Sequence, residues 1–584
     1  MRTKKRILLA ATPFVLTGVV LAGCTSLSGG ADSSTSSAQA AASTQSVDAT
    51  LTAEQVLTDN ADATTVTADA ADTADETIVT LSGDSATVDG EGATVEGNAV
   101  TITAGGTYHL SGELNGSVTV AAPDDAVVAI ILDGVDISNT EGSALAITSA
   151  DDVALVLAEG SVNALSDAGS YAEDADVNAA LYSDADLTIS GSGTLSVEGN
   201  GNDGITSKDD LRIVSGTVTV TAADDGLRGK DSLIVEGGTV TVTAGGDGLA
   251  SDQDADVTQG YIWVSAGQIE VTSDGDGLSA ATDVVVTGGE ISVTSGGGAS
   301  QARSDDVSSK AIKGGVYVVV EGGTITADAA DDAIHSNGAV HLNDGVLSLA
   351  SGDDGIHADS AIEIDGADTT ITRSYEGVES ADITIAGGSL AVTASDDGLN
   401  ASSGSGESMQ DSGEMITISG GVTIVDADGD GFDSNGSATM TGGELTIWGP
   451  TDNGNGAIDV NGTFDVSGGT LLAAGSAGMA TAPASDSAQG WVFATVDGAA
   501  GSSVEIVSDG EVVAEYTAAT GFSTVVYSGT EILSGSSYDV IVDGSATTVT
   551  AGEGGTGGMG PGQGGQGGGM PSGGRLGQSE DDGS

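Results

Sequence analysis

The sequence predicts an all-β chain wound as a parallel β-helix, a solenoid with about 22 residues per coil. One short phrase recurs along its middle: an acidic pair or Gly-Asp, then Gly, then Leu, Ile or Phe. Its closest copies, such as those at Asp203, Asp225 and Asp247, are spaced by one such period. A glycine also lies nine residues before the motif aspartate in most copies, as Gly216 does before Asp225. A fixed period in this range is typical of a solenoid.

Each period holds three short strands. The segment from Thr217 to Thr221 alternates Thr with Val, which predicts a strand with one buried face. A second strand, such as Leu233 to Val235, ends just before the next glycine, and the motif supplies the third, with its Leu or Ile inward. No helical pattern is visible, and a stack of antiparallel hairpins is the alternative. In a parallel β-helix, equivalent residues of successive coils are neighbours about 4.8 Å apart. The motif carboxylates would then lie in one line.

The charge is strongly unbalanced. The chain has 13 Lys and Arg against 87 Asp and Glu, a net charge of −74. Nucleic acid binding is disfavoured, because it depends on neutralising phosphates with Lys and Arg. Another interpretation of the acidity is solubility through self-repulsion. Aromatic residues make up only 3%, which is too few for an ordinary globular core of this length.

Composition divides the chain into five parts. We expect a signal peptide at 1–23, a disordered tether at 24–76, a β-helix at 77–490, a small C-terminal β cap at 491–550 and a Gly-rich disordered tail at 551–584. The tether is rich in Ser, Thr, Ala and Asp and has few large apolar residues, so it cannot bury a core. The cap region lacks the repeat and would cover an open end that otherwise invites aggregation.

The N-terminus has the features of a targeting segment. Basic residues between Arg2 and Arg6 precede an apolar run from Ile7 to Ala22. Leu21-Ala22-Gly23-Cys24 resembles the bacterial lipoprotein cleavage box, and Cys24 is the single cysteine. The resemblance implies cleavage before Cys24, lipidation of that residue, and an anchor at the extracellular face of the cytoplasmic membrane. The alternative for Cys24 is a buried structural cysteine.

Two segments flank the serial Asp-Gly-Leu coils: Ala104 to Gly112 with Leu132 to Ile137 before them, and Gly468 to Gly475 after them. In order and spacing they resemble the bacterial carbohydrate-binding domain-containing β-helix proteins, which are often lipoproteins and are similar in fold to pectate lyases. The resemblance covers residues 77–550. It implies a right-handed single-stranded parallel β-helix, bound calcium, and adhesion to plant-cell-wall polysaccharide.

Aligned carboxylates at glycine-rich turns offer the oxygen ligands that calcium takes. One candidate, the segment from Asp426 to Gly431, copies the first half of an EF-hand loop, but Ser437 stands where that loop needs Glu. The alternative is that these aspartates only cap turns through hydrogen bonds to the backbone. The candidate calcium ligands are Asp224, Asp225 and Asp247; Asp252, Asp254 and Asp256; and Asp426, Asp428 and Asp430.

Scarce cations and aromatics are the candidates for sugar contact. Lys208 and Lys230 are one period apart, so we expect them on one face with Arg228; Arg303 follows in an insertion. Cations of this kind recognise sugar carboxylates, although they could equally neutralise adjacent aspartates. Trp263 is the candidate for ring stacking, with the solenoid interior as its alternative position.

The histidines give no metal-ligand spacing. His335 and His357 are also one period apart, and we expect them to stack beside the motif, in a structural or sugar-contacting role.

The function expected from these features is a monomeric, surface-anchored, non-catalytic protein that binds acidic or plant-cell-wall polysaccharide, such as pectin, polygalacturonate or cellulose. Calcium would bridge the two polyanions. A calcium-dependent pectate-type lyase is the first alternative, with Arg228, Lys230 or Arg303 as its base. A structural adhesin or spacer is the second. The motif repeats in coil after coil whereas an active site is singular, which favours a non-enzyme.

Overall fold

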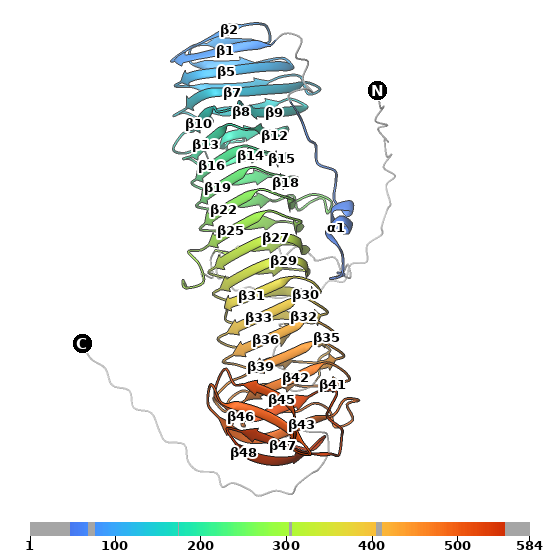
Figure 1. Cartoon of the computed structure of the whole chain (residues 1–584). Coiled ribbons are helices and arrows are strands. Elements are labelled where there is room, and N and C mark those ends of the chain that lie inside the picture. The colour runs from blue at the N-terminus through green and yellow to red at the C-terminus, as the bar shows by residue number, and fades with distance from the viewer. Residues whose placement is uncertain (1–46, 68–75, 173, 303–306, 404–410, 555–584) are drawn as a thin grey trace, which may run out of the picture. The chain divides into compact units, whose positions relative to one another are not determined.

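The computed structural model describes residues 47–67, 76–172, 174–302, 307–403 and 411–554. From β5 to β42 the chain winds in coils, and each strand pairs in parallel with the strand at the same position one coil later (Figure 1). Thr217 pairs with Thr239 and Leu227 with Leu249, so the offset between paired strands is the period of the motif. The all-β prediction is therefore confirmed, and the antiparallel hairpin stack is excluded.

The first of three ladders, here the motif ladder, carries the Asp-Gly-Leu repeat. Leu227 points inward and is fully buried, and a Cβ on Gly226 would lie 2.2 Å from Val242 Cγ1, so only glycine fits there. The motif thus puts a small residue where the backbone nears the facing ladder. Its strands are β3 (Ala93–Glu96), β4 (Ala99–Ile102), β6 (Ser117–Ala121), β8 (Leu145–Ser149), β11 (Ala179–Ser183), β14 (Asp203–Ser207), β17 (Leu227–Gly229), β20 (Leu249–Ser251), β23 (Leu278–Ala280), β26 (Ile312–Gly314), β28 (Ile334–Ser336), β30 (Ile356–Ile364), β32 (Val378–Ile385), β34 (Leu399–Ala401), β37 (Phe432–Ser434) and β40 (Asp459–Val460).

The second ladder, here the strap ladder, contains the short apolar runs. Val284, Val285 and Val286 are all fully buried, so this ladder is covered on both faces in its middle coils. Its strands are β1 (Thr77–Gly83), β2 (Ala86–Asp89), β5 (Gly106–Leu114), β7 (Val127–Ser138), β9 (Asp152–Leu157), β12 (Asp186–Gly191), β15 (Asp210–Ile213), β18 (Ser232–Val235), β21 (Tyr261–Val264), β24 (Asp283–Val286), β27 (Tyr317–Ala329), β29 (Ala339–Ser351), the ends of β30 and β32, β35 (Met415–Ile418), β38 (Ser437–Met440) and β41 (Phe464–Val466).

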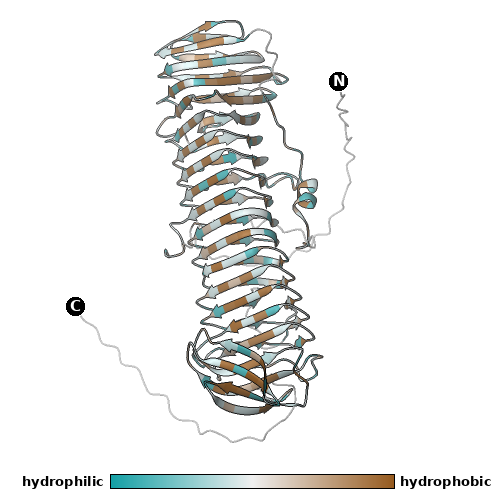
Figure 2. Cartoon of the chain, in the orientation of Figure 1, coloured by the Kyte–Doolittle hydropathy of each residue, from teal (hydrophilic) through white to brown (hydrophobic). Residues whose placement is uncertain are grey.

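The third ladder alternates in most of its strands, up to β36 (Val422–Ala427). In β16, the residues from Thr217 to Ala222 alternate between exposed and buried, and the hydropathy pattern shows the same alternation in many coils (Figure 2). This is the pattern expected for a strand with its apolar side toward the core. Besides the ends of β7, β27 and β29, its strands are β10 (Val162–Ser166), β13 (Thr194–Gly199), β16 (Thr217–Ala222), β19 (Thr239–Ala244), β22 (Gln268–Ser273), β25 (Glu290–Ser295), β31 (Asp368–Arg373), β33 (Ser389–Ala394), β36 (Val422–Ala427), β39 (Glu444–Trp448) and β42 (Thr470–Gly475).

The sheet is mixed rather than purely parallel, because both ends of the coil stack add antiparallel pairs. At the start, β1 pairs with β2 and β3 with β4. At the end, β46 (Phe522–Ser528) pairs antiparallel with both β42 and β43 (Trp491–Gly498). A second, four-stranded sheet contains β44 (Ser503–Ser508), β45 (Glu511–Thr517), β47 (Ser537–Val542) and β48 (Ser545–Thr550). A single parallel β-helix with a separate cap is thus too simple, since two cap strands extend the coil sheet and cover its open edge.

A segment that the sequence placed in a disordered tether instead packs on the strap ladder. Residues 47–67, here the strap, include the helix α1 (Ala53–Asp59), which begins with a capping box between Thr52 and Gln55. Val56 of this helix packs with Ala53 against Val285 and Val319. The tether prediction is therefore wrong for these residues, while residues 24–46 and 68–75 lie outside the described part of the chain.

Hydrogen bonds fix the strap along several coils. Asn60 donates to Asp283 at 3.0 Å, and the amide of Thr64 donates to Asp210 at 2.9 Å. Val66 then packs against Ala129 and Ala154. The strap covers an outward row of the ladder that is largely apolar, which accounts for the continuous apolar runs. No helix in the described residues is long and apolar enough to cross a membrane.

Candidate functional site: the Asp-Gly-Leu corner

The motif aspartates form a single line along the corner before the motif ladder. The backbone fixes this line, because the residue after each member donates its N–H to the carbonyl of the next member, as Gly226 does to Asp247. A lysine and a glutamate take two of the positions. In order, this acid column is Asp203, Asp225, Asp247, Asp276, Lys310, Asp332, Asp354, Glu376, Asp397 and Asp430.

In several coils, one carboxylate oxygen of the column residue accepts a hydrogen bond from a backbone N–H of the next coil. Asp225 Oδ1 accepts the backbone N–H of Asp247 at 2.8 Å, Asp247 Oδ1 that of Asp276 at 2.7 Å, and Asp276 Oδ1 that of Lys310 at 2.8 Å. The same bond joins Asp332 to Asp354. The repeated aspartate is therefore a structural ladder, in agreement with the turn-capping interpretation.

A second line of side chains runs beside the first. It consists of the outward residue three positions after each column member, and strand register places these residues next to one another. In many coils this residue contacts the second oxygen of the column acid, as Thr206 does with Asp203 at 2.8 Å. In order, this outer column is Thr206, Arg228, Ala250, Ser279, Lys313, His335, His357, Glu379, Asn400 and Asp433, and Asp459 continues it in the next coil, where Gly456 takes the column position.

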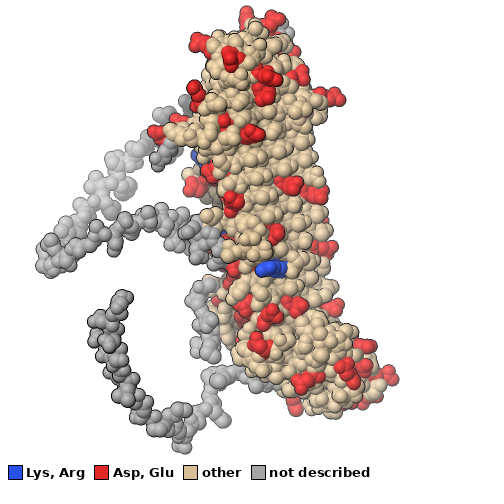
Figure 3. All heavy atoms as spheres, turned by 90° about the vertical axis from the view of Figure 1, so that its left-hand side faces the viewer, with Lys and Arg blue, Asp and Glu red and all other residues tan. Residues whose placement is uncertain are grey.

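Cations gather at this corner. On the face drawn in Figure 3, acidic side chains are scattered and Lys and Arg are rare. Within the described residues, Lys310 pairs with Asp331 and Asp332, and Lys313 pairs with Asp276 at 2.9 Å. Lys310 thus interrupts the acid column with a cation, and Lys313 lies beside it in the outer column. Burial lowers the pKa of Lys310, but the two aspartates outweigh burial and raise it overall.

The cations predicted to contact sugar differ in whether a nearby acid already pairs with them. Arg228 forms an ion pair with Asp252 and lies 3.8 Å from Asp203, and these acids raise its pKa against the effect of burial. Lys208 and Lys230 form no ion pair with a described residue, and Lys208 Nζ lies 5.9 Å from the ring centre of Tyr182. Burial lowers the pKa of Lys208, and Arg228 adds to this effect. Arg303 and Cys24 lie outside the described residues.

Trp263 lies on the outside of the coil, not in its interior. Its neighbours Ile262 and Val264 are fully buried, whereas the indole packs with the strap cluster around Val56 and donates to Thr287 at 3.0 Å. The strap thus occupies the surface that a sugar ring would need, which weighs against Trp263 as a stacking residue.

The structure does not bring the predicted calcium sets together. Asp254 and Asp256 are exposed, and Asp256 caps its own turn through Thr258, while Asp252 is taken by Arg228. Asp225 and Asp247 are joined through a backbone N–H, and Asp224 is exposed. None of these three-residue sets is among the convergent carboxylate groups of the described chain.

Asp430 does belong to a convergent group, but with other partners. Its carboxylate and those of Asp397 and Asp433 offer oxygens within 4.8 Å of one another, whereas Asp426 and Asp428 lie outside this group. Burial, reinforced by repulsion from neighbouring carboxylates, raises the pKa of Asp397 to about 8, of Asp433 to about 7 and of Asp430 to about 6. This set contains only oxygen donors, which is what calcium takes.

The expected histidine stack is confirmed. The rings of His335 and His357 lie 4.9 Å apart and are parallel within 5°. His335 Nδ1 contacts Asp332 at 2.8 Å. Burial lowers the pKa of His357, but hydrogen bonds to Asp354, Asp359 and Glu379 outweigh it and raise the pKa to about 12.

The sequence pattern did not reveal that Lys310 and Lys313 take positions in the two columns. Lys310-Ala311-Ile312-Lys313 occupies the motif position, as Glu376 does later. Asp276 and Lys310 lie more than one period apart because an insertion separates them, so a search at a fixed spacing overlooks this coil. The signal was the residue pattern itself: in Ala311-Ile312-Lys313 a small residue is followed by an inward apolar residue and then by an outward polar one.

Comparisons with known proteins agree on a carbohydrate-related family name. Residues 96–355 match the family model described as carbohydrate-binding domain-containing protein. A protein of that name from Acetivibrio thermocellus is 40% identical over 126 residues, which are 21% of this chain and 44% of that protein. The chain thus covers less than half of the length of this relative.

One solved structure is also similar. It is described as the polysaccharide lyase-like protein from C. thermocellum, gadolinium derivative, and shares 33% sequence identity over 38% of this chain and 92% of that chain, with a TM-score of 0.37.

Proposed function

We propose that this chain is a non-catalytic polysaccharide-binding protein. The observation that carries the proposal is the family-model match over residues 96–355, which includes the lysines of the corner from Lys208 to Lys313. Within that part, Lys208 and Lys230 are the cations without an ion pair among the described residues. They are the groups best able to contact the carboxylates of an acidic glycan.

Calcium is part of the proposal because the rest of the chain is strongly acidic. A net charge of −74 would repel polygalacturonate unless a cation lay between them. Asp397, Asp430 and Asp433 would hold calcium through their oxygens, and this donor set fits the ion. We further infer that the coils form one right-handed, single-stranded parallel β-helix, and that a lipid on Cys24 holds the monomer at the cell surface.

The test is co-sedimentation of the protein with polygalacturonate, pectin or cellulose, with and without a calcium chelator. We expect binding to an acidic glycan that the chelator abolishes. Replacing both Lys208 and Lys230 with Ala should weaken binding about tenfold or more, equivalent to ~1.4 kcal/mol. Arg373→Ala is the matched control, because Arg373 is an exposed cation on the third ladder. Binding that ignores the chelator would refute the calcium bridge.

A pectate-type lyase is the second candidate, and the lowered pKa of Lys208 favours it, since a base must be able to lose its proton. Arg228, one of the bases expected from the sequence, is tied to two aspartates and its pKa is raised. An unsaturated, ultraviolet-absorbing product that disappears in Lys208→Ala would establish the lyase. If no glycan binds and none is cleaved, the chain is a structural spacer.

A further inference from the structure

Two successive coils place an imidazole and two carboxylates around one point. Asp354 and His357 belong to one coil, and Glu379 is the outer-column residue of the next. Their ligand atoms lie within 4.8 Å of one another. We propose that Asp354, His357 and Glu379 bind a divalent transition-metal ion of the zinc type.

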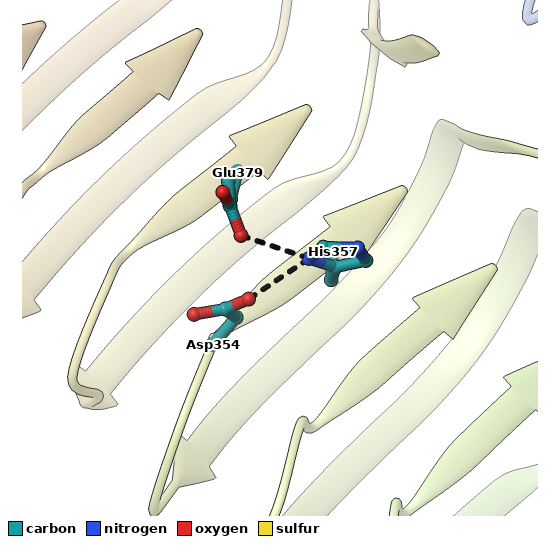
Figure 4. Close-up of side chains that lie close together, drawn as sticks. All are labelled: Asp354, His357 and Glu379. Atoms are coloured by element: carbon teal, nitrogen blue, oxygen red, sulfur yellow. Dashed lines mark hydrogen bonds and ion pairs between the residues drawn. The ribbon is translucent and has the colours of Figure 1, made fainter. Parts of the chain in front are cut away.

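The distances fit a metal site. His357 Nδ1 lies 2.9 Å from Asp354 Oδ2 and 3.1 Å from Glu379 Oε2, and both carboxylates point at this nitrogen (Figure 4). A neutral or charged imidazole carries at most one proton on Nδ1, so one acceptor would satisfy it. Ligand atoms about 2.0–2.2 Å from a tetrahedral metal ion lie about 3.3–3.6 Å apart, so a shift of a few tenths of an ångström would admit an ion here.

The other imidazole nitrogen is held as in known histidine metal sites. His357 Nε2 contacts Asp359 Oδ1 at 3.3 Å. Histidines that bind metals usually give their second nitrogen to a carboxylate, which fixes the ring and raises its basicity. Asp359 thereby leaves Nδ1 as the nitrogen that faces the two carboxylates.

The surroundings contain an unsatisfied polar atom. Asn400 follows Glu379 in strand register, and its Nδ2 donates to Glu376 at 2.7 Å. Asn400 is only 7% exposed, yet its Oδ1 has no hydrogen-bond partner among the described residues. The coil next to the proposed ligands therefore holds a buried acceptor without a donor in the described chain.

The donor set and its access favour a transition metal over calcium. Calcium takes oxygen ligands, whereas a nitrogen with two carboxylates suits zinc and its neighbours. The side chains of His357 and Glu379 are 21% and 20% exposed, so an ion can reach them from solvent. Asp359 adds a third carboxylate and Glu376, through Asn400, a fourth, so the acids near this imidazole exceed it in charge.

The neighbouring coil provides a matched control. His335 stacks on His357 and its Nδ1 also contacts an aspartate, Asp332, at 2.8 Å. No second carboxylate of the described chain reaches this nitrogen, however, because the next outer-column residue is His357 itself. Replacing His335 therefore removes a partly buried imidazole without removing the proposed ligands.

The experiment is a zinc titration of the chelator-stripped, tag-free chain by calorimetry, with millimolar calcium present to fill oxygen-only sites. We expect one zinc per chain, with binding about tenfold or more weaker in His357→Asn and Glu379→Gln but unchanged in His335→Asn. Circular dichroism confirms that each variant is folded, and Glu379→Gln, which changes a partly exposed side chain, keeps the test valid if His357→Asn unfolds. The absence of zinc binding, or equal loss in His335→Asn, would overturn the proposal.

Discussion

Asp225 allows the two roles of the acid column, backbone support and cation binding, to be separated. Its Oδ1 accepts the N–H of Asp247 from the next coil at 2.8 Å. An asparagine keeps this acceptor and removes the charge, whereas an alanine leaves the N–H of Asp247 without a partner. We therefore compare Asp225→Asn with Asp225→Ala, in the presence of a chelator.

The magnitude follows from burial. Burial, with repulsion from Asp203, Asp247 and Asp224, raises the pKa of Asp225 from 3.8 to about 7. Three units correspond to about 4 kcal/mol, and partial exposure reduces this to roughly 2–4 kcal/mol. Because the folded-state pKa is the higher one, this contribution to stability is complete below about pH 4 and is lost as the pH rises through 7. Asp225→Asn should thus be more stable than the wild type at pH 8, by about 2–4 kcal/mol, and close to it at pH 4.

Urea unfolding followed by tryptophan fluorescence measures this difference, since Trp263 lies in the coil after Asp247. Asp225→Ala should be about 1–3 kcal/mol less stable than Asp225→Asn at both pH values, through the unsatisfied N–H. If Asp225→Asn is as unstable as Asp225→Ala at pH 8, the charge itself is required. A gain that reverses only when calcium is added would instead restore Asp225 as a calcium ligand.

Two further substitutions test the packing of the coils. Val56→Asp places a charge in the contact between the strap and the coils, and should lower the thermal midpoint and open the strap to limited proteolysis, whereas Glu54→Ala, on the exposed side of α1, should do neither. Gly248→Ala should destabilise the chain by at least about 1–3 kcal/mol, since a Cβ there would lie 2.2 Å from Val271 Cγ1. Gly169→Ala, with no atom within 4 Å of the added Cβ, should unfold in urea at the wild-type midpoint; equal loss in both glycine variants would contradict the packing argument.

The coil could be predicted from the sequence because its three signals are local. Alternation of Thr and Val, a glycine at a fixed place and an inward Leu each report on one strand and its turn. The strap could not be predicted in the same way, since residues 47–67 contain few large apolar side chains. The sequence signal for the strap lies in the strands that it covers. Runs such as Val284 to Val286 do not alternate, and a strand that is apolar on both faces must be covered on both.

The candidate site was harder to predict because spacing in sequence gives the column but not the partners within it. Asp254 and Asp256 look like calcium ligands in a short loop, yet an aspartate can satisfy itself within its own turn, as Asp256 does. Convergence requires residues from two coils, as with Asp430 and Asp397, which an insertion moves apart along the chain. Only strand register, which the insertion hides, reveals that they are neighbours.

The proposed metal sites therefore depend on which residue accompanies a motif aspartate at the corner. Where an aspartate column member is followed three residues later by Thr or Ser, that hydroxyl contacts one of its oxygens, and Asn202 or the backbone of the next coil contacts the other. Where the outer residue is a lysine, a histidine or another acid, the charges of the two columns do not match, and an ion or ligand from solvent can neutralise the excess. The zinc and calcium proposals fall on such coils, at His357 and at Asp433, whereas Lys208 and Lys230 lie two residues beyond the outer-column residues Thr206 and Arg228. The substitution His357→Thr should accordingly abolish zinc binding while leaving the coil intact.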